Sequence, residues 1–170
     1  MSDRRLAYRG APPARVSSRH VGLVEKNSRK PIDVGVLNDH LGYFIRRLQI
    51  WVFQDFIRSL ASIDIRPAQY SVLVVVAANP GLSQSDLAAT LAIERARLVR
   101  LLDKLEKRGL TQRLDSRTDR RSHALRLTRR GQKVLRRAKA LAAAHESRLS
   151  AVLGIEQRKL LIDVLKGLGR

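Results

Sequence analysis

The feature that most constrains the fold is a change in the spacing of apolar residues along the chain. Over residues 37–107 large apolar side chains recur at three- and four-residue steps, which predicts helices. Residues 110–114 and 122–127 are short segments on either side of the polar stretch 115–121, and the second of them alternates, which predicts a β-hairpin. Helical spacing returns over residues 128–166. The expected fold is therefore mainly α with one small β-hairpin.

Capping and turn residues divide the helical part into segments. We expect helices over residues 37–59, 67–78, 84–91, 94–107, 128–152 and 156–166. Asn38 or Asp39 is expected to cap the first helix, and Ser83 the third. Pro67 fits the first turn of the second helix, and Gly109 is placed to end the fourth.

The first predicted helix carries two apolar stripes. One runs through Leu41, Phe44 and Leu48, and a neighbouring stripe includes Ile45 and Val52. A helix with two apolar stripes is expected to be buried on more than one side.

The charge of the chain is strongly positive. Lys and Arg number 34 against 15 Asp and Glu, which gives a net charge of +19. Such a chain repels itself unless a polyanion partner offsets the charge. Residues 94–136 hold fifteen of the basic residues and five of the acidic ones, a concentration typical of a nucleic-acid site. Double-stranded DNA is the expected partner, and a membrane surface or an acidic protein is the alternative.

The first 36 residues form a region of their own. Residues 1–31 carry eight basic and two acidic residues, few large apolar ones, and several prolines. This segment buries too little surface to offset the entropy lost on ordering, so we expect a flexible basic arm over residues 1–36. A solvated tail without a specific partner is the alternative.

Several classes of function find no support in the sequence. The chain has no cysteine, which excludes disulfides, thiolate metal sites and thiol oxidation sensing. His20, His40, His123 and His145 are scattered without metal-ligand spacing, and no glycine-rich phosphate loop or catalytic Ser/His/Asp signature is present. We expect no enzyme activity, metal or cofactor. No apolar run reaches membrane length and no signal peptide is evident, so we expect a cytoplasmic protein with no membrane partner.

The predicted helices 84–91 and 94–107 are joined by residues 92–93 and are followed directly by the basic hairpin. This is the order of a winged helix-turn-helix, and residues 63–139 form the expected DNA-binding domain. The second helix would enter the major groove, and the hairpin would place arginine against the adjacent backbone and minor groove.

Three motifs carry a resemblance to a known family. They are DKLEKRGL at 103–110, D-x-x-x-D-R-R at 115–121 and LTRRG at 127–131. Together they resemble the MarR family of transcription regulators, over about residues 37–166. The resemblance implies a homodimer whose base interlocks the N- and C-terminal helices, here residues 37–62 and 140–170, and which carries two winged-helix lobes. Such a dimer would bind a pseudo-palindromic operator, as a repressor.

Candidate DNA contacts follow from this architecture. They are Ser83, Gln84, Arg95, Arg97, Arg100, Arg117 and Arg120. Ser83 could serve as a helix cap alone, and the arginines of the fourth helix as a solvated basic face. Asp119 and Arg121 match a family pattern that we interpret as a brace within the wing. Family members often have a small hydroxyl pair where this chain has Ala96-Arg97, so no base contact is transferred to Arg97.

Many family members release DNA when a small aromatic or acidic molecule binds between the dimer base and the DNA lobe. The corresponding candidates here are His40, Tyr43, Phe44, Arg47, Trp51, Arg66 and Tyr70. Aromatic rings would stack on the ligand and arginines would hold its anion, although Phe44 and Trp51 also lie at core spacing. The motif LGYFIRR at 41–47 resembles the branch that controls breakdown of aromatic acids, including hydroxycinnamates and their CoA thioesters.

A different class of protein would show the same charge. An architectural protein binds DNA without sequence preference and needs no effector. A regulator should instead prefer its own site over random DNA by roughly 10³-fold or more.

Overall fold

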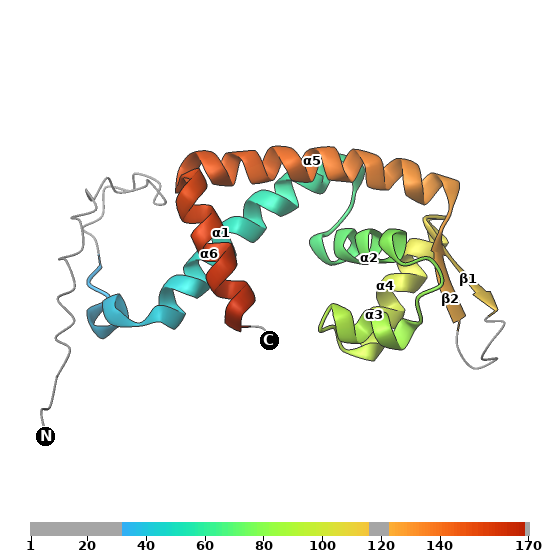
Figure 1. Cartoon of the computed structure of the whole chain (residues 1–170), viewed down its shortest axis with the longest axis horizontal. Helices are drawn as coiled ribbons and strands as arrows, with labels where there is room; N and C mark the ends of the chain where they lie inside the picture. Colours follow the sequence, from blue (N-terminus) through green and yellow to red (C-terminus); the bar gives the residue numbers. More distant parts are fainter. Residues whose placement is uncertain (1–31, 116–122, 169–170) are drawn as a thin grey trace, which may run out of the picture. The chain divides into compact units, whose positions relative to one another are not determined.

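The computed structural model describes residues 32–115 and 123–168, and every helix and strand belongs to the unit Val34–Arg170. The predicted arm at residues 1–31 lies outside the described residues. The element order is 3-10 helix Gly35–Asp39, α1 Leu41–Leu60, 3-10 helix Ala61–Ile63, α2 Pro67–Ala78, α3 Gln84–Thr90, α4 Arg95–Lys107, β1 Thr111–Asp115, β2 His123–Leu127, α5 Arg129–Leu153 and α6 Ile155–Leu168 (Figure 1). The expected class, mainly α with a small β-hairpin, is confirmed.

The start of the first helix differs from the prediction. Asn38 and Asp39 belong to a separate 3-10 turn, and α1 begins only at Leu41. His40 occupies the N-cap position with an extended backbone, and no side chain caps the helix. A residue inside a helical turn cannot adopt the extended backbone of an N-cap. Asn38 and Asp39 therefore cannot cap α1.

The other predicted helices are present, and their ends lie within two residues of the predicted ones. Pro67 is the first residue of α2. The Ser83 Oγ accepts a hydrogen bond from the Asp86 backbone N–H at 3.1 Å, and the Thr128 Oγ1 accepts one from Gly131 at 2.9 Å. Gly109 follows α4 with a φ of 65°, a conformation that glycine adopts without steric cost. The short connections therefore follow from ordinary capping chemistry.

The two strands form an antiparallel hairpin in which Thr111 pairs with Leu127 and Arg113 with Leu125. The first turn of α5 lies directly against this hairpin. A Cβ atom added to Gly131 would lie 1.9 Å from the Leu110 carbonyl oxygen, so only glycine permits this approach. The glycine of the LTRRG motif thus sets how closely α5 packs on the hairpin.

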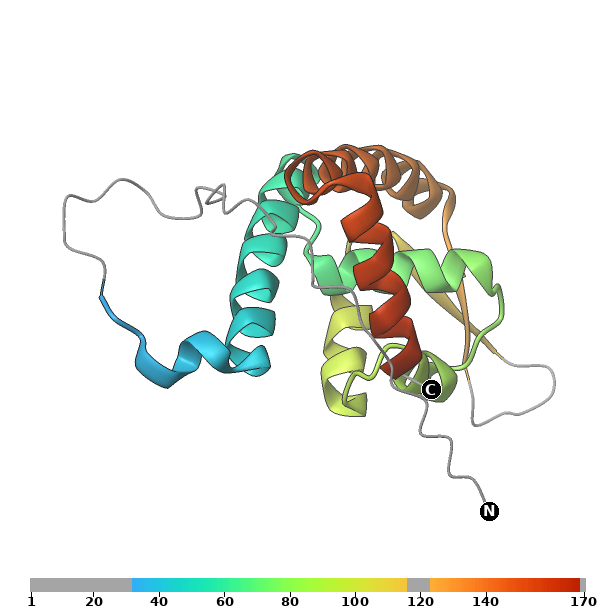
Figure 2. The same ribbon diagram turned by 60° about the vertical axis from the view of Figure 1, so that its left-hand side comes forward.

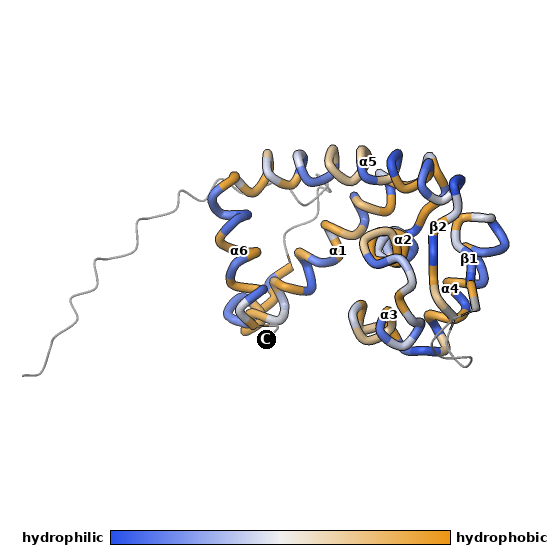
Figure 3. Tube along the Cα trace, turned by 45° about the vertical axis from the view of Figure 1, so that its right-hand side comes forward, coloured by the Kyte–Doolittle hydropathy of each residue, from blue (hydrophilic) through white to orange (hydrophobic). Residues whose placement is uncertain are grey.

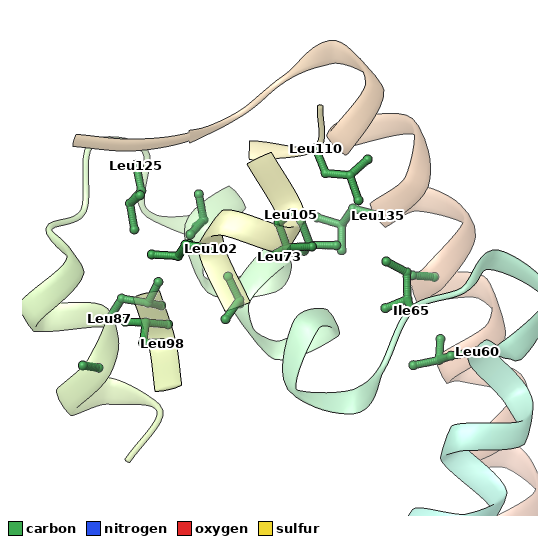
Figure 4. Packing of buried hydrophobic residues seen from close by; sticks show 14 residues of the cluster. Leu60, Ile65, Leu73, Leu87, Leu98, Leu102, Leu105, Leu110, Leu125 and Leu135 are labelled. Carbon is green, nitrogen blue, oxygen red and sulfur yellow. The ribbon is translucent and has the colours of Figure 1, made fainter. Parts of the chain in front are cut away.

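A single core of buried leucine, isoleucine and valine side chains joins α2, α3, α4, the hairpin and the first half of α5 (Figure 4). Leu87 of α3 and Leu98 of α4 are both fully buried within it. Leu102 and Leu105 extend the core along α4, and Leu125 covers it from β2. This packing gives α4 a defined position relative to the hairpin.

The helices at the two ends of the described chain are much less buried. Leu60 is the only buried residue of α1, and α6 has none. α1 and α6 each pack against α5, and α6 leaves the end of α5 at Gly154 (Figure 2). Apolar residues recur along both helices (Figure 3), and several are exposed, among them Leu41, Phe44, Ile45, Phe53, Leu160, Val164 and Leu165. The two stripes expected on the first helix are therefore present, but one chain does not cover them.

Among the described residues no single helix is long and apolar enough to cross a membrane, and only the pair Leu41–Ile63 and Pro67–Ala78, bent by 72°, meets that test when taken together by length and composition.

Candidate DNA-binding surface and effector site

The helix-turn-helix is built from α3 and α4 around a tight turn. The Ile93 backbone N–H donates to the Ala88 carbonyl at 3.0 Å. Ala92 has a φ of 48°, in the left-handed region, which reverses the chain within two residues. Because Leu87 and Leu98 are buried on either side of this turn, the angle between the helices is set by core packing.

The solvent face of α4 is a row of cations. Arg97, Arg100, Lys104 and Lys107 are all exposed, and we call these four residues the cationic stripe. Their spacing of three, four and three residues puts them on one side of the helix, opposite the buried leucines. The sequence analysis named Arg97 and Arg100 but missed Lys104 and Lys107, which the same helical spacing could have found.

Of the remaining candidates on α3 and α4, Ser83 and Arg95 have partners inside the motif. The Ser83 Oγ also donates to the Asp86 carboxylate at 2.7 Å, so its capping role is observed. Arg95 is exposed and donates to the Ser85 Oγ of α3, away from the cationic stripe. Gln84 is half-buried at the first position of α3.

The base of the wing is tied to α4 by an arginine that the sequence analysis missed. Arg113 of β1 contacts the Asp103 carboxylate at 2.6 Å and the Glu106 carboxylate at 2.6 Å. The Arg113 backbone N–H also donates to Glu106 at 3.3 Å. Charge-assisted pairs of this geometry are short and directional, so they orient the hairpin on the helix.

The predicted tip of the wing lies outside the described residues. This applies to Arg117 and Arg120 as DNA contacts and to Asp119 and Arg121 as a brace. Their roles stay predictions.

The C-terminal end of α4 is also joined to the turn between α1 and α2. The Arg108 guanidinium donates to the Asp64 carbonyl at 2.5 Å and to the Ile63 carbonyl at 3.3 Å. It also lies 3.5 Å from the Asp64 carboxylate. A displacement of the α1–α2 turn would therefore act directly on α4.

A polar cluster joins α1 to α5. The Asp55 carboxylate lies 2.7 Å from the His145 Nδ1 and 2.9 Å from the Arg148 Nη2. His145 is 2% exposed, and its ring stacks on Phe56 with centroids 4.8 Å apart. The hydrogen bond from His145 lowers the pKa of Asp55; burial opposes this effect, and Arg148 lowers the pKa further. The sequence analysis set the histidines aside as scattered, because Asp55 and His145 meet only in the folded chain.

The predicted effector residues fall into two groups. In the first half of α1, the Arg47 Nη1 donates to the Tyr43 hydroxyl at 2.9 Å, and the rings of Tyr43 and Phe44 are 5.4 Å apart. Phe44 is 50% exposed, so it does not pack into the core of its own chain. His40 is exposed at the start of this helix, and Trp51 is half-buried near its middle.

The second group lies where α1 ends and α2 begins. The Tyr70 ring packs edge-to-face on Phe56 at 5.4 Å. Burial raises the pKa of Tyr70, and the charge of Glu146 raises it further. Arg66 helps to line a small cavity of about 110 Å³ with Asp64. Tyr43 is thirteen residues from Phe56, about 20 Å along a helix, so within one chain the Tyr43 end of α1 is far from the second group.

No group of three or more His, Asp or Glu side chains within the described parts of the chain could hold a metal ion.

Comparison with known proteins agrees with this geometry. A family model described as MarR family matches residues 63–122. A transcriptional regulatory protein for the hcr operon of Thauera aromatica is 35% identical over 153 residues, which cover 89% of this chain and 92% of that protein. The chain belongs to the MarR family of transcription regulators. The winged helix-turn-helix class expected from the motifs is confirmed by the solved structures that it matches.

Two solved structures of family members are similar over nearly their whole length. The transcriptional repressor CouR bound to a 23-mer DNA duplex is 44% identical, with a TM-score of 0.80, and the match covers 83% of this chain and 100% of that one. CouR bound to p-coumaroyl-CoA is 42% identical, with a TM-score of 0.76, and the match covers 82% and 99% of the two chains.

Proposed function

We propose that this MarR-family chain is a homodimeric repressor whose DNA binding is released by an aromatic acyl-CoA thioester. The observation that carries the proposal is the similarity to CouR, which has been solved both with a DNA duplex and with p-coumaroyl-CoA. The relative from Thauera aromatica, a regulator of the hcr operon, is similar over 92% of its length. The protein would act on the chromosome in the bacterial cytoplasm.

The DNA contact would be made by α4 and the wing. Polar side chains at the start of α4 would face base edges in the major groove, and the cationic stripe would lie against phosphates. Arg117 and Arg120 of the wing would enter the narrow, negative minor groove, which suits the planar guanidinium group.

The dimer would form through α1 and α6. Their exposed apolar residues make a surface that a folded monomer rarely leaves in water. A second copy has the same surface, and a two-fold axis would let each cover the other. The two lobes would then read two half-sites of a pseudo-palindromic operator.

The effector would bind where the first half of α1 of one copy meets the second group of candidates, Arg66 and Tyr70, of the other copy. The dimer would thus bring together two groups that lie apart within one chain. Tyr43 and Phe44 would stack on the aromatic ring, and Arg47 would hold an anionic group. Through Arg108 and Asp64, a shift of the α1–α2 turn would move α4. A tenfold loss of DNA affinity requires about 1.4 kcal/mol of preference for the displaced geometry.

The central test is a binding competition. An operator would be selected from random duplexes, and its affinity measured by fluorescence anisotropy with and without p-coumaroyl-CoA, with free CoA as the matched control. We expect a preference of roughly 10³-fold for the selected duplex and a fall in affinity only with the thioester. Equal affinity for random DNA and no response to the thioester would instead identify an architectural DNA-binding protein.

The wing can be tested through salt dependence. Changing Arg117 and Arg120 to Ala should reduce the slope of log K against log salt by about 0.9 for each phosphate that the wing no longer neutralises. Changing Asp119 to Ala removes negative charge, yet it should weaken binding if that residue braces the wing. An unchanged slope in the arginine variants, or tighter binding by the Asp119 variant, contradicts these roles.

Arg47 separates effector binding from DNA binding. Changing Arg47 to Ala should weaken p-coumaroyl-CoA binding in titration calorimetry and leave DNA affinity without the thioester nearly unchanged. Linkage requires that operator DNA weaken binding of the thioester by the same factor as the thioester weakens binding of DNA. Thioester binding of equal strength with and without DNA would contradict the release mechanism.

A further inference from the structure

A second cavity opens between the end of α2, the hairpin and the first half of α5, and we call it the hairpin cavity. Its volume is about 580 Å³, within the range of about 300–1,000 Å³ found for small-molecule sites. No residue of α1 lines it, so it is separate from the effector site proposed above.

The residues that line the hairpin cavity divide into an apolar floor and a polar rim. The accessible part of the floor is formed by Leu127, which is half-buried, and by the exposed Ala77 and Pro80; Val76 and Leu135 lie beneath it in the core. The rim carries Arg126, Arg136 and Lys139, together with two glutamine side chains. Among the residues that the structure describes, no Asp or Glu lines the cavity.

The secondary structure explains how these side chains converge. Gln112 and Arg126 are directly paired across the hairpin, so they project from the same face. Arg113, the next residue along β1, points to the other face and contacts α4. On α5, Arg136 and Lys139 are three residues apart and share one side of the helix.

The three cations of the rim have no carboxylate partner among the described residues, as is also true of the cationic stripe. Among the described residues, Arg126, Arg136 and Lys139 form no ion pair or side-chain hydrogen bond, whereas Arg108 and Arg113 are each paired with carboxylates. Three like charges around one cavity repel one another, and an anion bound between them would relieve that repulsion. The apolar floor would at the same time favour a ligand with an apolar body.

We propose that the hairpin cavity binds a small amphipathic anion, a carboxylate or phosphate that carries an aromatic ring or a short apolar chain. The anionic group lies between Arg126, Arg136 and Lys139, and the apolar body rests on Leu127, Ala77 and Pro80. The glutamine side chains donate the remaining hydrogen bonds. A neutral ring lacks the electrostatic attraction, and an inorganic anion lacks the apolar contact.

The test uses the full-length protein and four probes in titration calorimetry: 2-naphthoate, 2-naphthyl phosphate, the neutral 2-naphthalenemethanol and inorganic phosphate. We expect saturable binding of the two aromatic anions, at least tenfold tighter than that of the neutral alcohol or of inorganic phosphate. The two aromatic anions also distinguish a carboxylate from a phosphate as the preferred group. Affinity should fall as salt is raised, because the rim is open to solvent.

Variants test whether the ligand binds in the hairpin cavity. The double change Arg136→Gln and Lys139→Gln should weaken 2-naphthoate at least tenfold, and Ala77→Trp, which fills the cavity from α2, should weaken it as well. The matched control is Arg137→Gln, an exposed arginine of α5 that does not line the cavity, and it should change the affinity less than twofold.

Amide chemical shifts supply a second measurement that does not depend on variants. 2-Naphthoate should shift the amides around Val76, Leu127 and Leu135 before those of α1. The proposal is overturned if Arg47→Ala abolishes binding while the double variant retains it, if Arg137→Gln weakens binding as much as the double variant, or if shifts are confined to α1.

Discussion

The winged-helix lobe and the pair α1 and α6 are both rich in apolar residues but bury them differently. In the lobe, α4 alone has three buried leucines, and α2, α3 and β2 add further fully buried side chains. In α1 only Leu60 is buried, and in α6 no residue is. The lobe therefore buries its apolar side chains within one chain. The apolar side chains of α1 and α6 stay exposed until another surface covers them.

This difference separates two roles of apolar residues in one chain. Those of the lobe set the position of α4 and the hairpin, and so the geometry of the DNA contact. Those of α1 and α6 contribute little to the fold of one copy and are available for association. Substitutions in the two regions should accordingly affect different measurements.

The largest expected effect is in the core of the lobe. Changing Leu105 to Ala removes a fully buried side chain and should lower the free energy of unfolding by about 2–5 kcal/mol, measured by urea denaturation. Leu114→Ala is the matched control, because Leu114 is 36% exposed and its truncation leaves a smaller cavity. Equal losses for the two variants would mean that burial in the lobe core does not determine how much Leu105 contributes to stability.

The next effect concerns association through α6. Changing Leu160 and Val164 to Asp places two carboxylates on the exposed apolar face and should weaken the dimer at least about 100-fold, or about 2.7 kcal/mol, in sedimentation analysis. The control changes Lys159 and Lys166 of the same helix to Asp. If the wild-type protein is monomeric at micromolar concentration, or if the apolar-face variant stays dimeric, α6 is not part of a dimer interface.

A smaller effect is expected at the base of the wing. Changing Arg113 to Gln should cost about 1–2 kcal/mol of stability, because the side chain is only partly buried, and should weaken DNA binding through the orientation of the hairpin. A double-mutant cycle with Glu106→Gln should give a coupling of about 1 kcal/mol. Arg126→Gln, on the opposite strand, should change stability by less than about 0.5 kcal/mol. Zero coupling in the cycle would contradict the role of this pair.

The smallest effect lies at Asp55, where α1 packs against the second half of α5. Because the folded-state pKa of Asp55 is lowered, its contribution to stability is present above the unfolded value of 3.8 and is lost as pH falls through the lower folded value. Changing Asp55 to Asn should therefore cost about 1 kcal/mol at pH 7 and progressively less below pH 3.8.

Urea denaturation across pH 3–7 measures the Asp55 contribution, with the exposed Asp163→Asn of α6 as the control. A cost that is constant over this range would show that the charge of Asp55 has no part in it.

Much of the fold could be predicted from local chemistry. Pro67, Ser83, Thr128 and Gly109 act within a few residues of their own position, and the predicted boundaries at these residues are confirmed. The prediction failed at the start of α1, where Asn38 and Asp39 are equally good caps by type, but the chain forms a 3-10 turn before the helix. The order of helices, turn and hairpin was likewise sufficient to identify the winged helix-turn-helix.

Contacts between distant segments were decided only by the tertiary structure. Asp55 and His145 are ninety residues apart, and Arg108 reaches a backbone carbonyl forty-four residues earlier. No local spacing encodes such pairs, because they depend on how α1 and α4 pack against their neighbours. By contrast, helical periodicity in the sequence is enough to place all four cations of the stripe, Lys104 and Lys107 included, on one face of α4. The hairpin cavity has no such signature, since it brings together side chains from α2, two strands and α5 that meet only once the core has packed.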